Sequence, residues 1–190
     1  MTDFQRSSNA LIVVDLQNDF CPGGSLAVEK GDNIIPTINR LLVIDEWLRI
    51  ATRDWHPQNH ISFEKQGGIW PEHCVQESYG AQFHSLLDSH FFDKIISKGV
   101  DESSEAYSGF QGTELATVLK ENGIKKIYVC GLATDYCVLA TALDARVEGL
   151  KVILLSDCVQ SVDVHEGDGQ KAIQEMIKSG CGILDSTVLK

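Results

Sequence analysis

Three residues in the sequence, Cys137, Asp15 and Lys98, could together carry out nucleophilic catalysis. Cys137 lies just inside a segment that we expect to be helical, where free N–H groups and the helix dipole favour a thiolate and could hold an oxyanion. A carboxylate can take the proton of a thiol, and a nearby ammonium can stabilise the resulting thiolate. Each residue also has a plainer interpretation, because most single cysteines are buried hydrophobes and an Asp–Lys pair can be purely structural.

A second group of residues could bind a metal ion. Asp54 and His56 are two residues apart at the end of an expected strand, so their side chains point to the same side. His73, from a later loop, could supply a third ligand, and His60 is a further candidate. Oxygen and imidazole ligands without thiolate suit Zn, Fe or Mn, and three protein ligands leave coordination positions open. Alternatively, these histidines could be scattered over the surface with no common role. That four of the six histidines fall within residues 56–84 argues against this alternative.

Three aromatic residues, Phe20, Trp70 and Tyr107, lie in expected loops close to these candidates. Their rings could enclose a flat ring of a ligand. Ordinary core packing would explain the same residues, and the pattern alone leaves both interpretations open.

Hydrophobic runs alternate with segments of helical period along the whole chain. Leu11–Val14 is a short, largely β-branched run, which is typical of a strand buried on both faces. The expected strands are residues 11–14, 48–52, 94–97, 127–130, 152–155 and 183–184, and the expected helices are residues 33–46, 81–91, 113–122, 135–148 and 169–178. This alternation predicts a three-layer α/β/α fold with a six-stranded, mostly parallel sheet flanked by helices on both faces.

The expected strands place the candidate residues at one edge of the sheet. Asp15, Asp54 and Lys98 each end or follow a strand, and Cys137 follows the turn after a fourth strand. Ligands of open parallel sheets bind beyond the carboxyl ends of the strands. The long irregular segment over residues 54–79 contains Trp, His, Pro and paired Gly, and such a segment in a compact domain is typically functional or disordered. Its aromatic residues argue against disorder.

Composition narrows the class of protein further. The 190 residues carry 16 basic and 27 acidic side chains, a net charge of −11, which argues against nucleic acid or anionic lipid as a partner. The longest apolar runs are about five residues, far short of a membrane span, and the polar start over residues 1–9 predicts no signal peptide. Six cysteines without a C-x-x-C pair predict free thiols and a cytoplasmic location. With no linker in the composition, we expect one domain over residues 1–190.

Six short motifs follow one another between residue 11 and about residue 145. They are VDLQNDF at 14–20, TRDWHP at 52–57, WPEHCV at 70–75, KG at 98–99, YSGF at 107–110 and GLATDYCV at 131–138. The first resembles the opening motif of the isochorismatase-like cysteine hydrolases, and the other five resemble the nicotinamidase branch of that family. Each motif is weak alone, but together and in this order they are highly specific.

The resemblance implies a metal-dependent amidase that converts nicotinamide to nicotinate and ammonia in NAD salvage, with pyrazinamide as a further substrate. Cys137 is similar to the family nucleophile, Asp15 to the base that takes its proton, and Lys98 to the cation that holds the thiolate. Asp54, His56 and His73 match the metal ligands, and we expect one zinc ion, with iron or manganese as alternatives. His60 lies where some members supply another ligand.

The same resemblance implies a cis peptide bond at Leu132–Ala133 and an oxyanion hole formed by the N–H groups of Ala133 and Cys137. Phe20, Trp70 and Tyr107 match pocket aromatics. Two other functions stay open: a sister hydrolase acting on another small amide or on isochorismate, and a non-catalytic metal-binding or redox-sensing thiol protein. The substrate is expected to be a small molecule, and the chain could form a homo-oligomer.

Overall fold

The computed structural model describes residues 7–189. Most of the polar start that argues against a signal peptide, residues 1–6, lies outside this range. The described strands and helices are, in chain order, β1 (Asn9–Val14), α1 (Ile35–Leu42), β2 (Leu48–Asp54), β3 (Lys94–Lys98), α2 (Leu115–Glu121), β4 (Lys126–Leu132), α3 (Leu139–Val147), β5 (Lys151–Gln160), α4 (Asp168–Lys178) and β6 (Gly182–Leu184).

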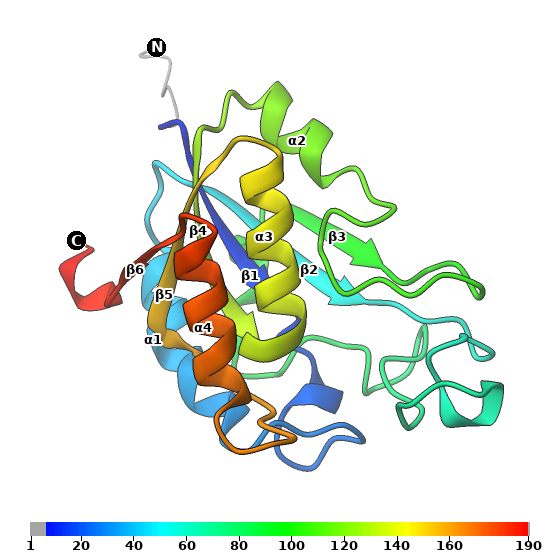
Figure 1. The fold of residues 1–190 in the computed structure, drawn as a ribbon. Helices are drawn as coiled ribbons and strands as arrows, with labels where there is room; N and C mark the ends of the chain where they lie inside the picture. Colours follow the sequence, from blue (N-terminus) through cyan, green and yellow to red (C-terminus); the bar gives the residue numbers. More distant parts are fainter. Residues whose placement is uncertain (1–6, 190) are drawn as a thin grey trace.

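The six strands form one sheet in the order β3-β2-β1-β4-β5-β6, and every neighbouring pair is parallel (Figure 1). β1 lies in the middle, where Ile12 pairs with Ile50 of β2 on one side and Val129 of β4 on the other. Residues 10–14 of β1 are fully buried, as expected of a strand covered on both faces. The predicted α/β fold with a six-stranded parallel sheet is confirmed.

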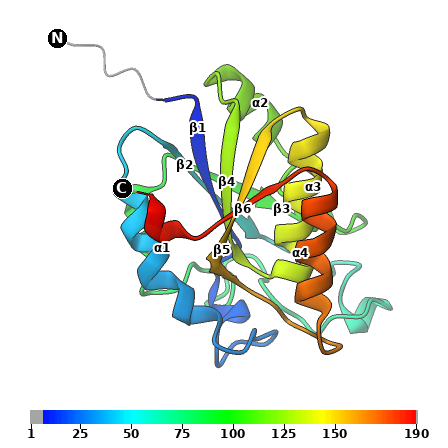
Figure 2. The same cartoon turned by 60° about the vertical axis from the view of Figure 1, so that its left-hand side comes forward.

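Helices cover both faces of the sheet, α1 on one side and α2, α3 and α4 on the other (Figure 2). Alternate residues of β1 face the two layers: Leu11 and Val13 pack in the core with α1, and Ala10, Ile12 and Val14 pack in the core with the other three helices. Every helix in the described part of the chain is too short or too polar to cross a membrane.

One expected helix is wrong. Residues 81–91 form turns that end in a short 3-10 turn at Ser89–Phe91. The backbone of this segment is hydrogen-bonded to the chain that follows β1: Asn18 N–H donates to the Gln82 carbonyl, and His84 N–H donates to the Leu16 carbonyl. These tertiary hydrogen bonds outweigh the weak helical pattern of the segment.

The carboxyl ends of β1, β2, β3 and β4 lie at one edge of the sheet, and the loops beyond them form the lower part of the molecule in Figure 1. β2 and β3 end side by side, with Asp54 paired to Lys98 in register. The chain after β4 enters α3 through one π-helical turn, Thr134–Val138. This edge is where the sequence places its reactive side chains.

Candidate active site

Asp15, Lys98 and Cys137 meet in the interior at the carboxyl edge of the sheet. The Lys98 ammonium lies 2.9 Å from Asp15 Oδ2 and donates a hydrogen bond to Cys137 Sγ at 3.4 Å and to the Ala106 carbonyl at 3.2 Å. It also pairs with Oδ1 of Asp54. All four charged or nucleophilic side chains are buried. Because each comes from a different strand or turn, only the folded sheet brings them together.

Lys98 is the common partner of this cluster. Burial alone would lower the pKa of its ammonium, but the charges of Asp15 and Asp54 outweigh that effect and raise it well above the ordinary value. Lys98 therefore stays charged in the interior. A buried ammonium is stable only when it is paired and hydrogen-bonded, and two carboxylates, a carbonyl and a thiol sulfur meet this need.

Asp15 is held in an uncommon backbone conformation, with φ of +48°. Oδ1 of its carboxylate accepts a hydrogen bond from the Thr52 hydroxyl at 2.7 Å. Oδ2 forms the ion pair with Lys98 but accepts no hydrogen bond of favourable angle, which leaves this oxygen able to take a proton. Burial raises the pKa of Asp15, with the charge of Lys98 acting against it. A carboxylate with a raised pKa is a better base than an exposed one.

Cys137 differs from the expectation of a favoured thiolate. It lies within the π-helical turn and is 7% exposed. Burial raises the pKa of its thiol well above the usual value, and the charge of Lys98 offsets this only in part, because Asp15 and Asp54 oppose it. A carboxylate oxygen of Asp15 lies within 4.8 Å of the sulfur. This surrounding favours the protonated thiol, and Asp15 is the neighbouring base that could take its proton.

Asp54, His56 and His73 form a compact group of potential metal ligands. One ligand atom from each lies within 4.8 Å of the others, and all three side chains are buried. Asp54 Oδ2 lies 3.5 Å from His56 Nε2 and 4.0 Å from His73 Nε2. Nδ1 of His56 bonds to the Gly99 carbonyl at 2.9 Å, and Nδ1 of His73 bonds to the Pro71 carbonyl at 2.8 Å.

These backbone bonds fix the chemistry of the two rings. A carbonyl oxygen can only accept a hydrogen bond, so each Nδ1 carries the proton, and in the neutral ring each Nε2 keeps the lone pair that faces Asp54. Gly99 permits the arrangement, because a Cβ at this position would lie 2.4 Å from Cε1 of His56. Two imidazole nitrogens and one carboxylate oxygen converging on one point fit a divalent metal ion.

The carboxylate of Asp54 is ionised in this surrounding. Burial would raise its pKa, but the charge of Lys98 and the contacts with His56 and His73 hold the pKa well below its usual range. Burial would lower the pKa of His56, but Asp54 stabilises a second proton on its ring and raises the pKa above its ordinary value, whereas burial lowers the pKa of His73. The group thus offers one anionic ligand and two imidazoles.

His60 is next to the group of potential ligands but contributes no atom to it. Its Nδ1 bonds to the Ser62 hydroxyl at 2.7 Å and its Nε2 to the Ser104 carbonyl at 3.0 Å, so both ring nitrogens have protein partners. The ring stacks on His56 with centroids 4.1 Å apart. His60 therefore packs against His56 with both of its ring nitrogens hydrogen-bonded to the protein.

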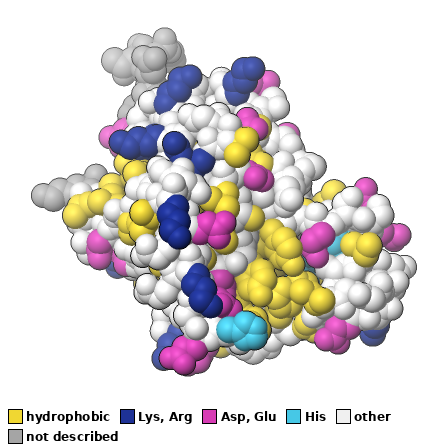
Figure 3. All heavy atoms as spheres, in the orientation of Figure 1, with side chains coloured by type: hydrophobic (Ala, Val, Ile, Leu, Met, Phe, Trp, Pro, Cys, Tyr) yellow, Lys and Arg dark blue, Asp and Glu magenta, His cyan; other side chains and the backbone are white. Residues whose placement is uncertain are grey.

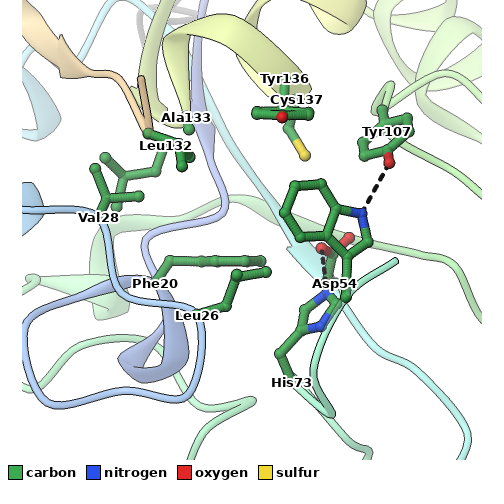
Figure 4. A pocket seen from close by; sticks show the side chains of 12 residues that line it. Phe20, Leu26, Val28, Asp54, His73, Tyr107, Leu132, Ala133, Tyr136 and Cys137 are labelled. Carbon is green, nitrogen blue, oxygen red and sulfur yellow. Dashed lines mark hydrogen bonds and ion pairs between the residues drawn. The ribbon is translucent and has the colours of Figure 1, made fainter. Parts of the chain in front are cut away.

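A pocket beside this cluster opens to solvent and contains Cys137, Asp54 and His73 in its wall (Figure 4). Phe20, Trp70 and Tyr107 all line it, and Trp70 Nε1 donates a hydrogen bond to the Tyr107 hydroxyl at 2.9 Å. The remaining lining residues are Leu26, Val28, Leu132, Ala133, Tyr136 and Val162. At the surface, hydrophobic side chains gather between the lower end of α3 and the segment after β2 (Figure 3).

Figure 4 shows how the pocket is divided. Asp54 and His73 lie at one end, Cys137 points in from the turn before α3, Val28 and Leu132 lie at the other end, and Phe20 and Leu26 lie between the two ends. A flat heterocycle could thus lie with polar ring atoms near the potential metal ligands and its apolar edge against aliphatic side chains.

The turn that carries Cys137 begins as the resemblance implies, with a cis peptide bond at Leu132–Ala133. The Ala133 carbonyl accepts hydrogen bonds from the N–H groups of Tyr136 and Val138, both at 3.1 Å. Ala133 and Cys137 both line the pocket. Their N–H groups therefore belong to the same short turn at the pocket wall.

Several residues of this region are absent from the sequence prediction. Tyr136 lines the pocket and adjoins Cys137, so its place in the motif could have identified it. Val162 follows the carboxyl end of β5, and a residue in that position of a parallel sheet could have been expected near the pocket. For Leu26 and Val28 the sequence gives no comparable signal, because they are ordinary aliphatic residues in an irregular segment.

Comparisons with known proteins agree with this geometry. The isochorismatase domain family matches residues 9–188. The chain is 41% identical over 198 residues to the nicotinamidase of Acinetobacter baylyi, covering 93% of this chain and 92% of that protein.

Two solved structures are also similar. The pyrazinamidase of Pyrococcus horikoshii in complex with zinc has a TM-score of 0.88 and 49% identity, covering 94% of this chain and 99% of that one. PnC1 from L. infantum in complex with nicotinate has a TM-score of 0.90 and 38% identity, covering 96% of each chain.

Proposed function

Because the chain belongs to the isochorismatase family, we propose that the pocket is that of a metal-dependent cysteine amidohydrolase. It converts nicotinamide to nicotinate and ammonia, and pyrazinamide to pyrazinoate, and so serves NAD salvage. One observation carries the proposal most directly: the buried Lys98 ammonium contacts Asp15 and Cys137 beside a ready group of metal ligands. A purely structural ion pair would have no need of either the thiol or the histidines.

In the first half of the reaction, Asp15 takes the proton of the Cys137 thiol as the sulfur attacks the carboxamide carbon. Lys98 stabilises the negative charge on sulfur while the new bond forms. The N–H groups of Ala133 and Cys137 hold the developing oxyanion; loss of one such donor typically costs about 10²–10³ in rate. The proton on Asp15 then passes to the leaving nitrogen, so ammonia departs and a thioester to Cys137 remains.

In the second half, a water molecule attacks the thioester carbon. Asp15, again ionised, accepts the proton of this water, and the carbon–sulfur bond breaks to release the acid. The proton returns to the sulfur, which restores the resting thiol. One molecule of water is consumed, and one ammonia and one carboxylic acid are produced.

We further propose that Asp54, His56 and His73 hold a zinc ion. A carboxylate and two imidazoles without thiolate suit zinc, and iron or manganese could occupy the same donor set. When bound, the ion supplies a Lewis acid that can hold the heterocyclic nitrogen of the substrate. Phe20, Trp70 and Tyr107 would then enclose the ring in the pocket.

We also propose that residues 1–190 act as one isochorismatase-like hydrolase domain. The single sheet and the match over residues 9–188 support this. A cytoplasmic location is proposed from the six free cysteines, which suit a reducing compartment.

The function is tested by a substrate panel. Purified, metal-loaded protein is incubated with nicotinamide, pyrazinamide and isochorismate, and ammonia and the organic acids are quantified. We expect ammonia and nicotinate in equal amounts from nicotinamide, and ammonia from pyrazinamide. Turnover of isochorismate with none of nicotinamide would contradict the proposal and identify a sister hydrolase.

A further inference from the structure

The turn that follows Asp15 carries two polar side chains that take no part in the mechanism above, Gln17 and Asp19. Gln17 is fully buried, and Asp19 is half-buried. Both form hydrogen bonds with the backbone of segments that carry the potential metal ligands. Their contacts indicate what these two side chains do.

The side-chain amide of Gln17 bonds to the backbone of Asp54 where a neighbouring strand would otherwise do so. Val13 and Ala51 are the last paired residues of β1 and β2, and the last backbone bond between the two segments runs from the Asp15 N–H to the Thr52 carbonyl at 3.2 Å, where Asp15 has a φ of +48°. The side-chain amide of Gln17 continues the pairing: Nε2 donates to the Asp54 carbonyl at 2.7 Å, and Oε1 accepts from the Asp54 N–H at 2.8 Å.

The second N–H of the same amide is also used. Nε2 of Gln17 donates to the Ala81 carbonyl at 2.9 Å, so both N–H groups and the oxygen have partners. A fully satisfied buried amide has one well-defined orientation. The peptide groups on both sides of the Asp54 Cα are thereby fixed, and they place the side chain whose carboxylate pairs with Lys98 and faces the two histidines.

Asp19 acts similarly beside His73. Oδ2 of Asp19 accepts a hydrogen bond from the N–H of Cys74 at 2.7 Å, and Cys74 directly follows His73 with a φ of +46°. Oδ1 accepts from the N–H of Ser25 at 3.2 Å. The carboxylate lies so close to the chain at Gly80 that a Cβ there would be 2.0 Å from Oδ2.

The geometry points to Gln17 and Asp19 as positioning residues for the metal site, Gln17 through Asp54 and Asp19 through His73. His73 comes from an irregular segment, and Asp54 comes from the end of β2. Both segments are bonded to the same short turn, which sets their spacing. The inference rests on the proposed function in taking these ligands to bind the catalytic ion, and it adds which residues hold them in place.

The test measures metal binding to the metal-free protein, independently of activity. Gln17→Met keeps the length of the side chain but removes its three hydrogen bonds, and Asp19→Asn keeps the shape but removes the charge. We expect each variant to bind Zn²⁺ or Co²⁺ about 10–100-fold more weakly in competition with a chromophoric chelator, as for other residues that orient metal ligands. The visible spectrum of bound Co²⁺ should change as well.

Asn18→Ala is the matched control. Asn18 lies in the same turn, and its side-chain amide donates to the Tyr79 carbonyl at 2.8 Å, so the substitution also removes a side-chain bond to the long loop. It removes no bond next to a ligand, so metal affinity and Co²⁺ spectrum should equal those of the unsubstituted protein. The melting temperature of each metal-free variant separates loss of stability from loss of positioning.

Unchanged affinity and spectrum in folded Gln17→Met and Asp19→Asn would overturn the inference. Should Gln17→Met fail to fold, Gln17→Glu retains the size and the bond from Asp54 N–H, and its affinity for the metal should still fall.

Nicotinamide turnover of the unsubstituted protein, measured in parallel, separates the positioning role from the proposed function. Turnover with unaltered metal affinity in the variants rejects only the positioning role, and weakened affinity without turnover in the parent rejects only the proposed function.

Discussion

The two halves of the site are assembled from different kinds of structure. The nucleophilic half, Asp15, Lys98 and Cys137, comes from the ends of β1 and β3 and the turn before α3. The metal half joins Asp54 at the end of β2 and His56 just after it to His73, which lies in an irregular segment. Strand ends and one regular turn thus place the first group, whereas side-chain hydrogen bonds must place part of the second.

The halves also differ in how their charges are satisfied. Lys98 is compensated within the protein by Asp15 and Asp54, so the nucleophilic half is complete without an added ion. In the metal half, two imidazole nitrogens face one carboxylate and can be completed by a cation. The thiol chemistry is thus built into the sheet, whereas the metal site is joined to it through the pair of Lys98 and Asp54.

The largest effect should come from Cys137→Ala. Without the sulfur no thioester can form, so ammonia release from nicotinamide should be abolished. Metal content measured by atomic absorption should stay that of the unsubstituted protein, because the ligand group is intact. Normal turnover in this variant would refute the assignment of the nucleophile.

Lys98→Met should affect both halves, because it removes the charge that they share. We expect kcat to fall by about 10²–10⁴, the range for losing a group that assists proton transfer. Two buried carboxylates lose their partner, so the free energy of unfolding, measured with urea, should also fall by about 3–5 kcal/mol. A variant with near-normal kcat and stability would show that the two halves are not linked through this ammonium.

His56→Ala should weaken the metal half while leaving the fold intact. We expect metal content after gel filtration to fall well below one ion per chain, with turnover falling in proportion and restored in part by excess metal. His60→Gln is the comparison, since both nitrogens of His60 bond to Ser62 and Ser104. Equal metal loss in both variants would mean that His60 is a ligand after all.

The smallest effect should come from Tyr107→Phe, which touches neither half directly. It removes the acceptor for the Trp70 indole N–H at the pocket wall. One such hydrogen bond contributes about 0.5–1.5 kcal/mol, so KM for nicotinamide should rise about two- to tenfold with kcat unchanged. A fall in kcat at constant KM would place Tyr107 closer to the chemistry than proposed.

The sequence predicts the strand-borne part of the site well, for a physical reason. A buried strand such as Leu11–Val14 has a clear hydrophobic pattern, and the residue after it must lie at the carboxyl edge of a parallel sheet. The structure accordingly brings together Asp15, Asp54, Lys98 and Cys137. Their roles in catalysis stay proposals until variants are measured.

Features that depend on contacts distant in the sequence could not be predicted. Residues 81–91 fail to form a helix because their backbone bonds to the turn after β1. Burial and the charges of two nearby aspartates raise the pKa of the Cys137 thiol. The position of Cys137 in the chain reveals neither of these causes. The bonds of Gln17 to Asp54 likewise require that the chain has already turned at Asp15.

The central claim, that a cysteine nucleophile and a metal site act together on nicotinamide, is tested most directly by one titration. Ammonia release is followed in protein stripped of metal by a chelator and then titrated with Zn²⁺, Fe²⁺ or Mn²⁺. We expect activity to disappear on stripping and to return at one ion per chain. Full turnover of nicotinamide in metal-free protein would contradict the account, because the thiol half alone would then suffice.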